Sequence, residues 1–204
     1  MDEPKPRGRP RTFDRETALD AAVDMFWRHG YEGTSIADLT AAMGVTPPTL
    51  YAAFGSKEDL YRLALARYLE RSERGRGGVS GGSAYALIEN YLRAAADRFT
   101  DPGRPRGCMV STASLYCAAE NEAARSAAAA MRAVGFAAAV AACERAKSTG
   151  ELPPATDAVA LARFYSAIAQ GMSVQAVDGA TAADLHALVD LALAAWPGVR
   201  PDAG

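Results

Sequence analysis

A short amphipathic segment, followed by a glycine and then by proline, places the tightest constraint on how this chain can fold. Ile36, Leu39 and Met43 repeat at helical spacing and give one apolar face. Gly44 follows as a residue on which a helix can end in the left-handed conformation, and Pro47 suits the first position of a new helix. Helix, glycine-containing turn and helix make up the helix-turn-helix pattern, whose second helix enters the major groove of DNA. The segment therefore predicts a DNA-binding protein.

The rest of the sequence favours an all-α fold. Half of the 204 residues are apolar, Ala is abundant, and runs of β-branched residues are scarce. Apolar spacing predicts a small N-terminal three-helix helix-turn-helix domain, a longer fourth helix and a larger C-terminal helical bundle, with about nine helices in all. The later helices are expected at 84–99, 108–118, 122–147, 157–177 and 182–196.

Hydroxyl and acidic side chains mark several of the expected helix starts. Three pairs have the spacing of a capping box, in which each side chain bonds the backbone amide of the other residue. These pairs are Ser35 with Asp38, Ser56 with Asp59, and Thr181 with Asp184. Asp14 and Thr46 stand where single caps would begin the first and third helices.

Glycine content and charge divide the chain into four segments. Residues 1–12 form a basic arm, 13–75 the helix-turn-helix domain, 76–83 a Gly-rich segment and 84–199 the second bundle. The Gly-rich segment is either a hinge between domains or an ordinary loop, and the residues favour neither. It is not a phosphate-binding loop, because no Gly-Lys-Ser/Thr closes it and no strand is expected before it.

The net charge of −2 is not typical of a nucleic-acid binder, so any DNA affinity must come from local placement of charge. The arm supplies such a cluster, because Lys5, Arg7, Arg9 and Arg11 lie together without an acidic residue. Its Arg-Gly-Arg-Pro core resembles an AT-hook, in which Arg7 and Arg9 would lie in a narrow A·T-rich minor groove. A nonspecific basic tail that only contacts phosphates is the alternative.

The sequence argues against several other classes of protein. Three scattered cysteines cannot build a disulfide scaffold and fit a reducing cytosol, so a cytoplasmic location is expected. No N-terminal apolar run indicates a signal peptide, and the segment closest to a membrane span, 127–142, is interrupted by Arg132 and Gly135. The only histidines, His29 and His186, lie in no metal-binding or catalytic spacing, so we expect no enzyme, metal site or cofactor.

Residues 12–72 resemble the N-terminal domain of the TetR family of transcriptional regulators. The resemblance rests on capped turns and apolar positions in register: Asp14, Phe26, Gly30-Tyr31, Thr34-Ser35-Ile36, Leu39, Met43-Gly44-Val45-Thr46, Thr49-Leu50-Tyr51, Phe54-Gly55-Ser56-Lys57-Glu58 and Leu60. Gly107-Cys108-Met109 and residues 169–176 resemble a subgroup of the same family. The resemblance implies a homodimer, a ligand pocket in the C-terminal bundle, and repression that a small molecule relieves.

The resemblance also assigns DNA contacts to matching positions. Thr34 and Ser35 would offer hydroxyls and amides to a phosphate at a helix N-terminus, although simple capping would also explain them. Lys57 would contact a phosphate, unless it is only a solvated lysine. With the arm, the predicted DNA-binding set is Arg7, Arg9, Thr34, Ser35, Thr46, Pro47, Pro48, Thr49, Tyr51, Ala52 and Lys57.

One departure from the family pattern narrows how the second helix of the motif would read DNA. Many members carry Lys, Arg or Gly around positions 47 and 48, where this chain has two prolines, and positions 46–54 hold no charged residue. Without Arg or Lys, this helix can make no bidentate contact to guanine. Thr49, Tyr51 and apolar contacts to thymine methyl groups remain, so we expect at least one contacted A·T pair in each half-site.

The last expected helix is apolar around more than half of its circumference, which is too wide for one internal face. The residues concerned are Leu185, Leu188, Val189, Leu191, Ala192 and Ala195. An intrachain core would also explain them, but the resemblance favours a four-helix interface between two copies. Two recognition helices would then lie roughly 34–36 Å apart on a near-palindromic operator.

For an effector site the sequence offers only candidates, each of which also suits an ordinary core. They are Met109, Tyr116, Met131, Phe136, Phe164, Tyr165 and Met172, with Gln170 or Gln175 as polar anchors. The expected effector is apolar or aromatic.

Two alternative functions follow from other residues. Cys108 comes after Arg104 and Arg106 at an expected helix start, where a thiolate would be favoured and a redox sensor would be possible. A small buried side chain is the commoner role for such a cysteine. An architectural DNA-binding protein without sequence preference is the second alternative.

Overall fold

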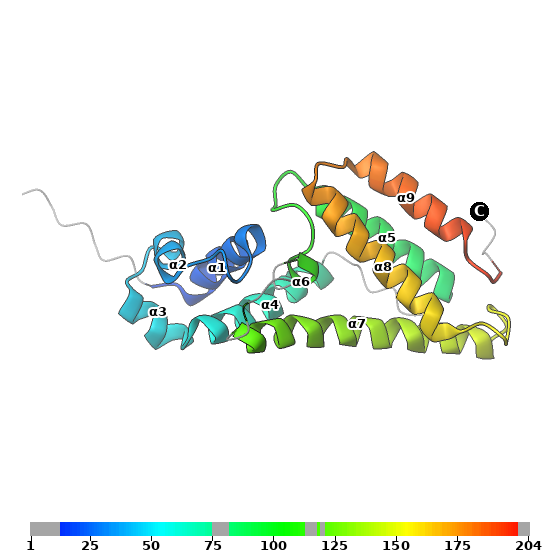
Figure 1. The fold of residues 1–204 in the computed structure, drawn as a ribbon, viewed down its shortest axis with the longest axis horizontal. Helices are drawn as coiled ribbons and strands as arrows, with labels where there is room; N and C mark the ends of the chain where they lie inside the picture. The colour runs from blue at the N-terminus through cyan, green and yellow to red at the C-terminus, as the bar shows by residue number, and fades with distance from the viewer. Residues whose placement is uncertain (1–12, 75–81, 113–117, 119–120, 200–204) are drawn as a thin grey trace, which may run out of the picture.

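The computed structural model describes residues 13–74, 82–112, 118 and 121–199, which form nine helices and no strand (Figure 1). The N-terminal helices are α1 (Arg15–His29), α2 (Ile36–Met43), α3 (Pro47–Phe54) and α4 (Lys57–Arg74). The later helices are α5 (Ala84–Thr100), α6 (Met109–Thr112), α7 (Glu122–Ser148), α8 (Ala158–Val177) and α9 (Ala182–Ala194). The predicted all-α class is confirmed, whereas the predicted arm and most of the predicted Gly-rich segment lie outside the described residues.

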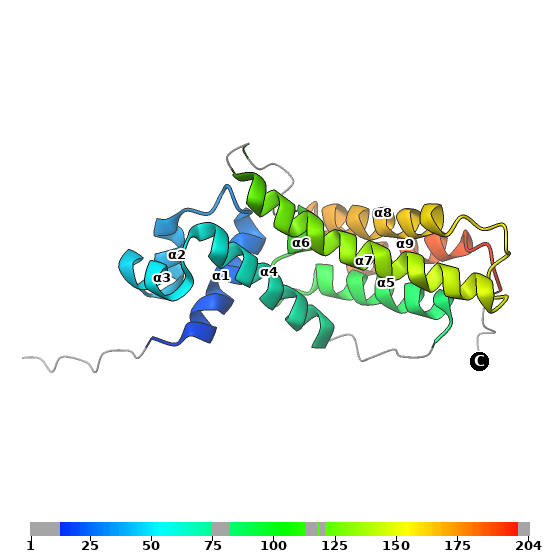
Figure 2. The same cartoon turned by 90° about the horizontal axis from the view of Figure 1, so that it is seen from below.

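The helices form two groups joined by one long helix. Helices α1–α4 gather at one end of the molecule, and α5, α8 and α9 lie together at the other (Figure 1). The view from below shows α7 passing beside α4 and then continuing along α5 and α8 (Figure 2). α7 therefore connects the two groups over most of the length of the molecule.

Local sequence signals produce the helix-turn-helix. The Ser35 hydroxyl accepts a hydrogen bond from the Asp38 amide, and the Asp38 carboxylate accepts one from the Ser35 amide. Gly44 ends α2 at φ 67°, in the left-handed region that a residue with a Cβ atom rarely adopts. The predicted caps also form at Asp14, at Ser56 with Asp59, and at Thr181 with Asp184.

Aromatic rings fill the first core. Phe26 is fully buried, stacks on Tyr31 with ring centroids 6.2 Å apart, and meets the edge of Tyr61 at 5.0 Å. Trp27, on the same side of α1, packs edge-on against Tyr68 of α4 at 4.8 Å. These contacts hold α1 against α4, and α2 also packs against α1.

The first core does not end with the N-terminal helices. Met109 and Val110 of α6 and Ala124 and Ala128 of α7 are buried within it. The sequence division at residues 76–83 assigned these four residues to the C-terminal bundle. α6 and the start of α7 therefore complete the hydrophobic core of the DNA-binding part.

The second core lies between α5, α8 and α9, with the far end of α7 closing one side. Its largest fully buried side chains include Leu92 and Phe99 of α5, Met172 of α8 and Leu185 of α9. Trp196 follows α9 and packs its ring against Tyr85 and Tyr165. Much of the remaining core is alanine, which allows these helices to approach one another closely.

α7 confirms the helix that the sequence predicted at 122–147, but it corrects the expectation that Arg132 and Gly135 interrupt the apolar segment too much for a membrane span. The helix continues through Arg132 and Gly135, and by length and composition alone it could cross a membrane, although only 11% of its apolar window is buried in the molecule. Its ends instead contribute to the two cores, and the Arg132 guanidinium donates to the Val110 carbonyl at 2.5 Å. This length is consistent with a bridge between the two groups of helices.

Candidate nucleic-acid interface

α3 presents an uncharged and largely exposed face. Leu50 is fully buried and Phe54 nearly so, and both pack into the first core, which fixes the orientation of the helix. The side chains turned outward are Pro47, Pro48, Tyr51, which is 49% exposed, and Ala52. Four of the residues predicted to meet DNA are therefore brought together on one accessible surface.

The hydroxyls at the start of α3 bond one another. Thr46 occupies the cap position with extended backbone, but its side chain makes no capping hydrogen bond. Its Oγ1 atom lies 3.0 Å from Oγ1 of Thr49. The prediction that the Thr46 side chain caps α3 is wrong, because Pro48 at the second helical position has no amide hydrogen and the Thr46 hydroxyl bonds the Thr49 hydroxyl rather than the Thr49 amide. Thr46 remains exposed and Thr49 half-buried.

Thr34 and Ser35 are placed differently from one another. Ser35 is exposed at the start of α2. Thr34 is fully buried, and its hydroxyl donates to the Gly30 carbonyl at 2.7 Å. The expectation that the Thr34 hydroxyl faces a phosphate is therefore corrected: it closes the turn between α1 and α2. Only Ser35 of this pair is available at the surface.

Two cations lie close to the helix-turn-helix. The Lys57 ammonium stands 4.2 Å from the centroid of the Tyr31 ring, which holds the half-buried lysine at the start of α4. Arg15 was not predicted from the sequence. Its guanidinium lies 4.9 Å from the Phe54 ring centroid, and its Nε donates to the Ala53 carbonyl at 3.5 Å, at the end of α3. The only sequence feature that could have indicated this position for Arg15 is that it directly follows Asp14, the cap of α1.

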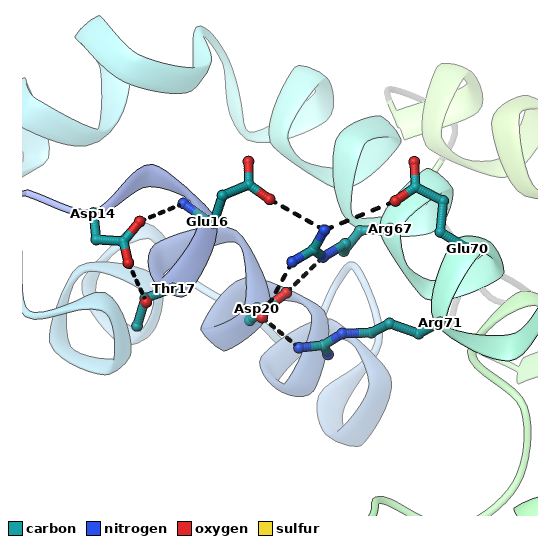
Figure 3. A network of polar contacts seen from close by, with 7 residues as sticks. All are labelled: Asp14, Glu16, Thr17, Asp20, Arg67, Glu70 and Arg71. Carbon is teal, nitrogen blue, oxygen red and sulfur yellow. Dashed lines mark hydrogen bonds and ion pairs between the residues drawn. The ribbon is translucent and has the colours of Figure 1, made fainter. Parts of the chain in front are cut away.

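A network of ion pairs fastens α1 to α4 (Figure 3). Arg67 donates to Asp20 at 2.8 Å and pairs with Glu16 at 3.1 Å, while Arg71 pairs with Asp20 at 2.6 Å. Burial raises the pKa of the Asp20 carboxyl, but the hydrogen bond from Arg67 and the nearby positive charges outweigh burial and leave that pKa below its ordinary value. The network fixes α4 relative to α1. α2 packs against α1, and α3 packs against α2.

A second polar contact joins the loop after α1 to the residues just before α7. The Glu32 carboxylate, in the loop after α1, accepts hydrogen bonds from the Ala118 amide at 2.6 Å and from Asn121 Nδ2 at 2.8 Å. These two hydrogen bonds, that from Asn121 first, lower the pKa of Glu32 below its ordinary value. The contact ties the helix-turn-helix to the residues just before α7.

The two C-terminal motifs noted in the sequence lie against each other. The Cys108 amide donates to the Ser173 hydroxyl at 2.8 Å. Gly107 has φ 77°, and a Cβ atom there would come within 2.8 Å of the Ser173 carbonyl oxygen. Arg106 donates to the Ala176 carbonyl at 2.6 Å. The half-buried Cys108 side chain packs beside both cores, as a small structural residue would.

The predicted dimer residues divide between the core and the surface. Leu185, Val189 and Ala192 are buried in the second core, so their assignment to a dimer face is corrected. Leu188 is half-buried, whereas Ala195 is exposed and Leu191 is 76% exposed. The apolar stripe of α9 is broader than one helix face because one side of it packs into the second core and the other side lies at the surface.

α8 extends the exposed apolar surface of α9. Phe164 is 41% exposed and Val174 45% exposed. Ala160, Ala167 and Gly171 are also exposed, at spacings that place them on the same side of α8. Exposed apolar side chains therefore lie on α8 and on α9, two helices that contact each other, and they have no covering element in the described part of the chain.

The predicted effector residues do not converge on one cavity. Met109 is buried in the first core and Met131 packs against it, whereas Tyr165 and Met172 belong to the second core. Phe136 is half-buried under the Arg163 guanidinium, 4.7 Å from its ring centroid. Phe164, Gln170 and Gln175 are exposed. Tyr116, like Arg7 and Arg9, lies outside the described residues.

Comparisons with known proteins cover both parts of the molecule. Residues 18–64 match the family model of bacterial regulatory proteins of the tetR family, and residues 84–191 match that of the tetracyclin repressor-like C-terminal domain. The HTH-type transcriptional repressor ComR of Escherichia coli (strain K12) is 36% identical over 197 residues, which cover 95% of this chain and 93% of ComR. The repressor BdcR of the same strain is 37% identical over 113 residues, 50% of this chain and 53% of BdcR.

A solved structure shows the same overall arrangement. It is a cysteine mutant of the TetR family transcriptional regulator CifR complexed with 26bp double-strand operator DNA. That protein is 45% identical to this chain, with a TM-score of 0.85, and the match covers 93% of this chain and 100% of the other.

The exposed recognition helix on a three-helix core, joined to a second helical bundle, defines a helix-turn-helix transcriptional regulator that binds DNA. The chain belongs to the tetR family of bacterial regulatory proteins.

Proposed function

We propose that this regulator is a repressor that binds a near-palindromic operator as a homodimer and leaves it when a small-molecule effector binds. The exposed, uncharged face of α3 carries the proposal, because two buried side chains hold it in position for the major groove. The named repressors ComR and BdcR and the operator complex of CifR support the same reading.

The α3 face supplies the base contacts in this proposal. Thr49 and Tyr51 provide hydroxyls to base edges, and Pro47, Pro48 and Ala52 provide apolar contacts to thymine methyl groups. The face lacks the charged side chains that read guanine most strongly. The operator half-site therefore contains at least one contacted A·T pair.

Contacts to phosphate come from the surroundings of α3. The first free amides of α2 lie beside the exposed Ser35, and Lys57 and Arg15 place positive charge at the start of α4 and beside the end of α3. Arg7 and Arg9 add a minor-groove contact in the manner of an AT-hook. Most of the electrostatic attraction thus lies outside the recognition helix.

The homodimer forms through the exposed apolar surface of α8 and α9. Phe164, Val174 and Leu191 would each lose accessible surface when a second copy packs on it. Pairing two helices from each copy places the two α3 helices on successive major grooves. The effector is an apolar or aromatic small molecule that binds within the C-terminal bundle. The protein acts in the cytoplasm, and it is a regulator rather than an enzyme.

Binding to the chain's own upstream region tests the proposal. Lys57→Gln should weaken binding and lower the slope of log affinity against log salt concentration by about 0.9 for one lost phosphate contact. Lys147→Gln, at the far end of α7 beside Glu144, is the matched control and should leave the slope unchanged. An equal slope for wild type and Lys57→Gln would remove Lys57 from the interface.

Selection of bound sequences from a random pool separates a regulator from an architectural protein. The proposal expects two related half-sites, each with a contacted A·T pair. Half-sites built wholly of G·C would contradict the proposed role of α3, and binding without any sequence preference would support the architectural alternative.

A further inference from the structure

A cavity of about 390 Å³ opens between the DNA-binding helices and the connection that leads to α6. One side is formed by α1 and α4, through Trp27 and Tyr68, and the other by the loop at Arg104 and Pro105. Its volume lies within the range of small-molecule sites. None of the described residues predicted to hold the effector lines it, so it is distinct from the effector site proposed for the C-terminal bundle.

The inner wall of the cavity is aromatic, and one of its buried polar atoms has no hydrogen-bond partner among the described residues. Trp27 is 8% exposed and Tyr68 3% exposed, and their rings meet at nearly right angles. Trp27 Nε1 is buried and has no hydrogen-bond partner in the part of the chain that the structure describes, whereas the buried Tyr68 hydroxyl interacts with the side chains of Cys108 and Ser72. Unsatisfied buried donors are costly and rare in native proteins, so this wall is incomplete without a further group.

Two arginines and one aspartate line the rim of the cavity. Arg71 and Arg104 both line it, and each has one carboxylate partner, Asp20 at 2.6 Å and Asp101 at 3.2 Å. A guanidinium has five N–H donors, so donors remain on both side chains after these pairs form. Asp24 also lines the cavity and opposes a second negative charge on any ligand.

We propose that this cavity is a regulatory site for a small aromatic monoanion, such as an aryl carboxylate. The ring would lie against Trp27 and Tyr68, and the carboxylate would accept hydrogen bonds from Arg71 and Arg104. A ligand here touches α1 and α4 on one side and the loop before α6 on the other, so it biases the position of the helix-turn-helix relative to the bundle. Ligand binding and DNA binding are then coupled, and each changes the affinity of the other by the same factor.

Benzoate and its neutral counterpart benzamide test the chemistry of the site. In a Trp196→Phe variant, Trp27 is the only tryptophan, so its fluorescence reports on the cavity. We expect a saturable change of Trp27 emission with benzoate and an affinity at least about tenfold lower for benzamide, because benzamide lacks the charge. No saturable response from folded protein would overturn the proposal, as would equal affinities for the two compounds.

Substitutions at the rim test the location. Arg104→Gln should weaken benzoate binding about tenfold or more, and Asp24→Asn should tighten it. Arg125→Gln is the matched control, because Arg125 is an exposed arginine of α7 that pairs with Glu122 by an i,i+3 contact. Circular dichroism checks the fold of each variant. Equal benzoate affinity in wild type and Arg104→Gln would overturn the assignment.

The proposed coupling between the cavity and DNA binding is tested by measuring DNA affinity with and without saturating benzoate. We expect at least a fivefold change that Arg104→Gln diminishes, and an unchanged DNA affinity would overturn the coupling. Because benzoate binding is read without DNA, failure of this site and failure of the proposed repressor function give different results.

Discussion

The two ends of this molecule are built on different principles. Helices α1–α4 surround aromatic side chains, α2 and α4 begin at capping boxes, and α3 exposes a small polar and proline-rich face. Helices α5, α8 and α9 bury many alanines and leave Phe164, Val174 and Leu191 at the surface. The first end buries its large apolar side chains within one chain, with help from α6 and α7. The second leaves an apolar surface that a second copy would cover. The two ends therefore differ in how much of their apolar surface a single chain buries.

The largest effect should come from opening the aromatic core. Phe26→Ala removes a fully buried ring that contacts Tyr31 and Tyr61 and should lower the free energy of unfolding by about 3–5 kcal/mol. Urea denaturation followed by circular dichroism measures the change. A loss below about 1 kcal/mol would show that the first core is not the rigid unit described above.

A charge on the exposed surface of α9 should separate the copies without unfolding either. Leu191→Asp should raise the dissociation constant of the dimer at least about a hundredfold, because a buried unpaired charge costs several kcal/mol. Val134→Asp on α7 is the control, since Val134 is 72% exposed and belongs to neither α8 nor α9. Sedimentation at several concentrations measures the dimer. Equal dissociation constants for both variants would place the interface elsewhere.

The Asp20 network should make the stability of the first end depend on pH. The pKa of the Asp20 carboxyl is lower in the folded state than in the unfolded state. The contribution of Asp20 to the free energy of unfolding is therefore present above the unfolded-state pKa near 4, and it is lost as pH falls through the folded-state pKa. Asp20→Asn should lower the free energy of unfolding at neutral pH by about 1–3 kcal/mol and flatten its acid dependence.

Asp190→Asn supplies the comparison at the second end. Asp190 pairs with Arg93, but its side chain is 64% exposed, so the change should cost less than about 1 kcal/mol. If the two substitutions cost the same and leave the acid dependence alike, the α1–α4 network has no special role.

The smallest effects separate two hydroxyls that look alike in the sequence. Ser35→Ala removes a capping hydrogen bond and should lower the free energy of unfolding by about 1 kcal/mol. Thr46→Ala should cost only a few tenths, because Thr46 occupies a cap position without making a capping bond. Thermal denaturation of both variants measures the difference. A larger loss for Thr46→Ala would contradict the geometry at the start of α3.

Much of the first end could be predicted from the sequence because its signals are local. A capping box, a glycine in the left-handed region and a proline at the first helical turn each act within four residues, and together they define α2, the turn and α3. Thr34 could not be placed this way. Its neighbour Ser35 caps α2, while Thr34 turns inward because of a carbonyl contributed by the preceding turn at Gly30.

The second end was harder to predict because alanine carries little information about which side of a helix is buried. α7 has Ala or Gly at most positions between 127 and 142, so its sequence did not show that it joins two cores. The stripe on α9 was recognised, but Leu185 and Leu191 look equivalent until α5 and α8 are in place. The cavity at Trp27 depends on a loop almost eighty residues further along the chain, which no local pattern connects to it.

One measurement tests the central claim, that a complete DNA-reading end is paired through an apolar surface of the other end. The purified chain is bound to its own upstream region, the protected bases are mapped, and the mass of the complex is measured by native mass spectrometry. The account predicts two chains on two related half-sites whose centres lie roughly 34–36 Å apart, or a multiple of that distance. A single chain on one half-site, or protection without sequence preference, would contradict it.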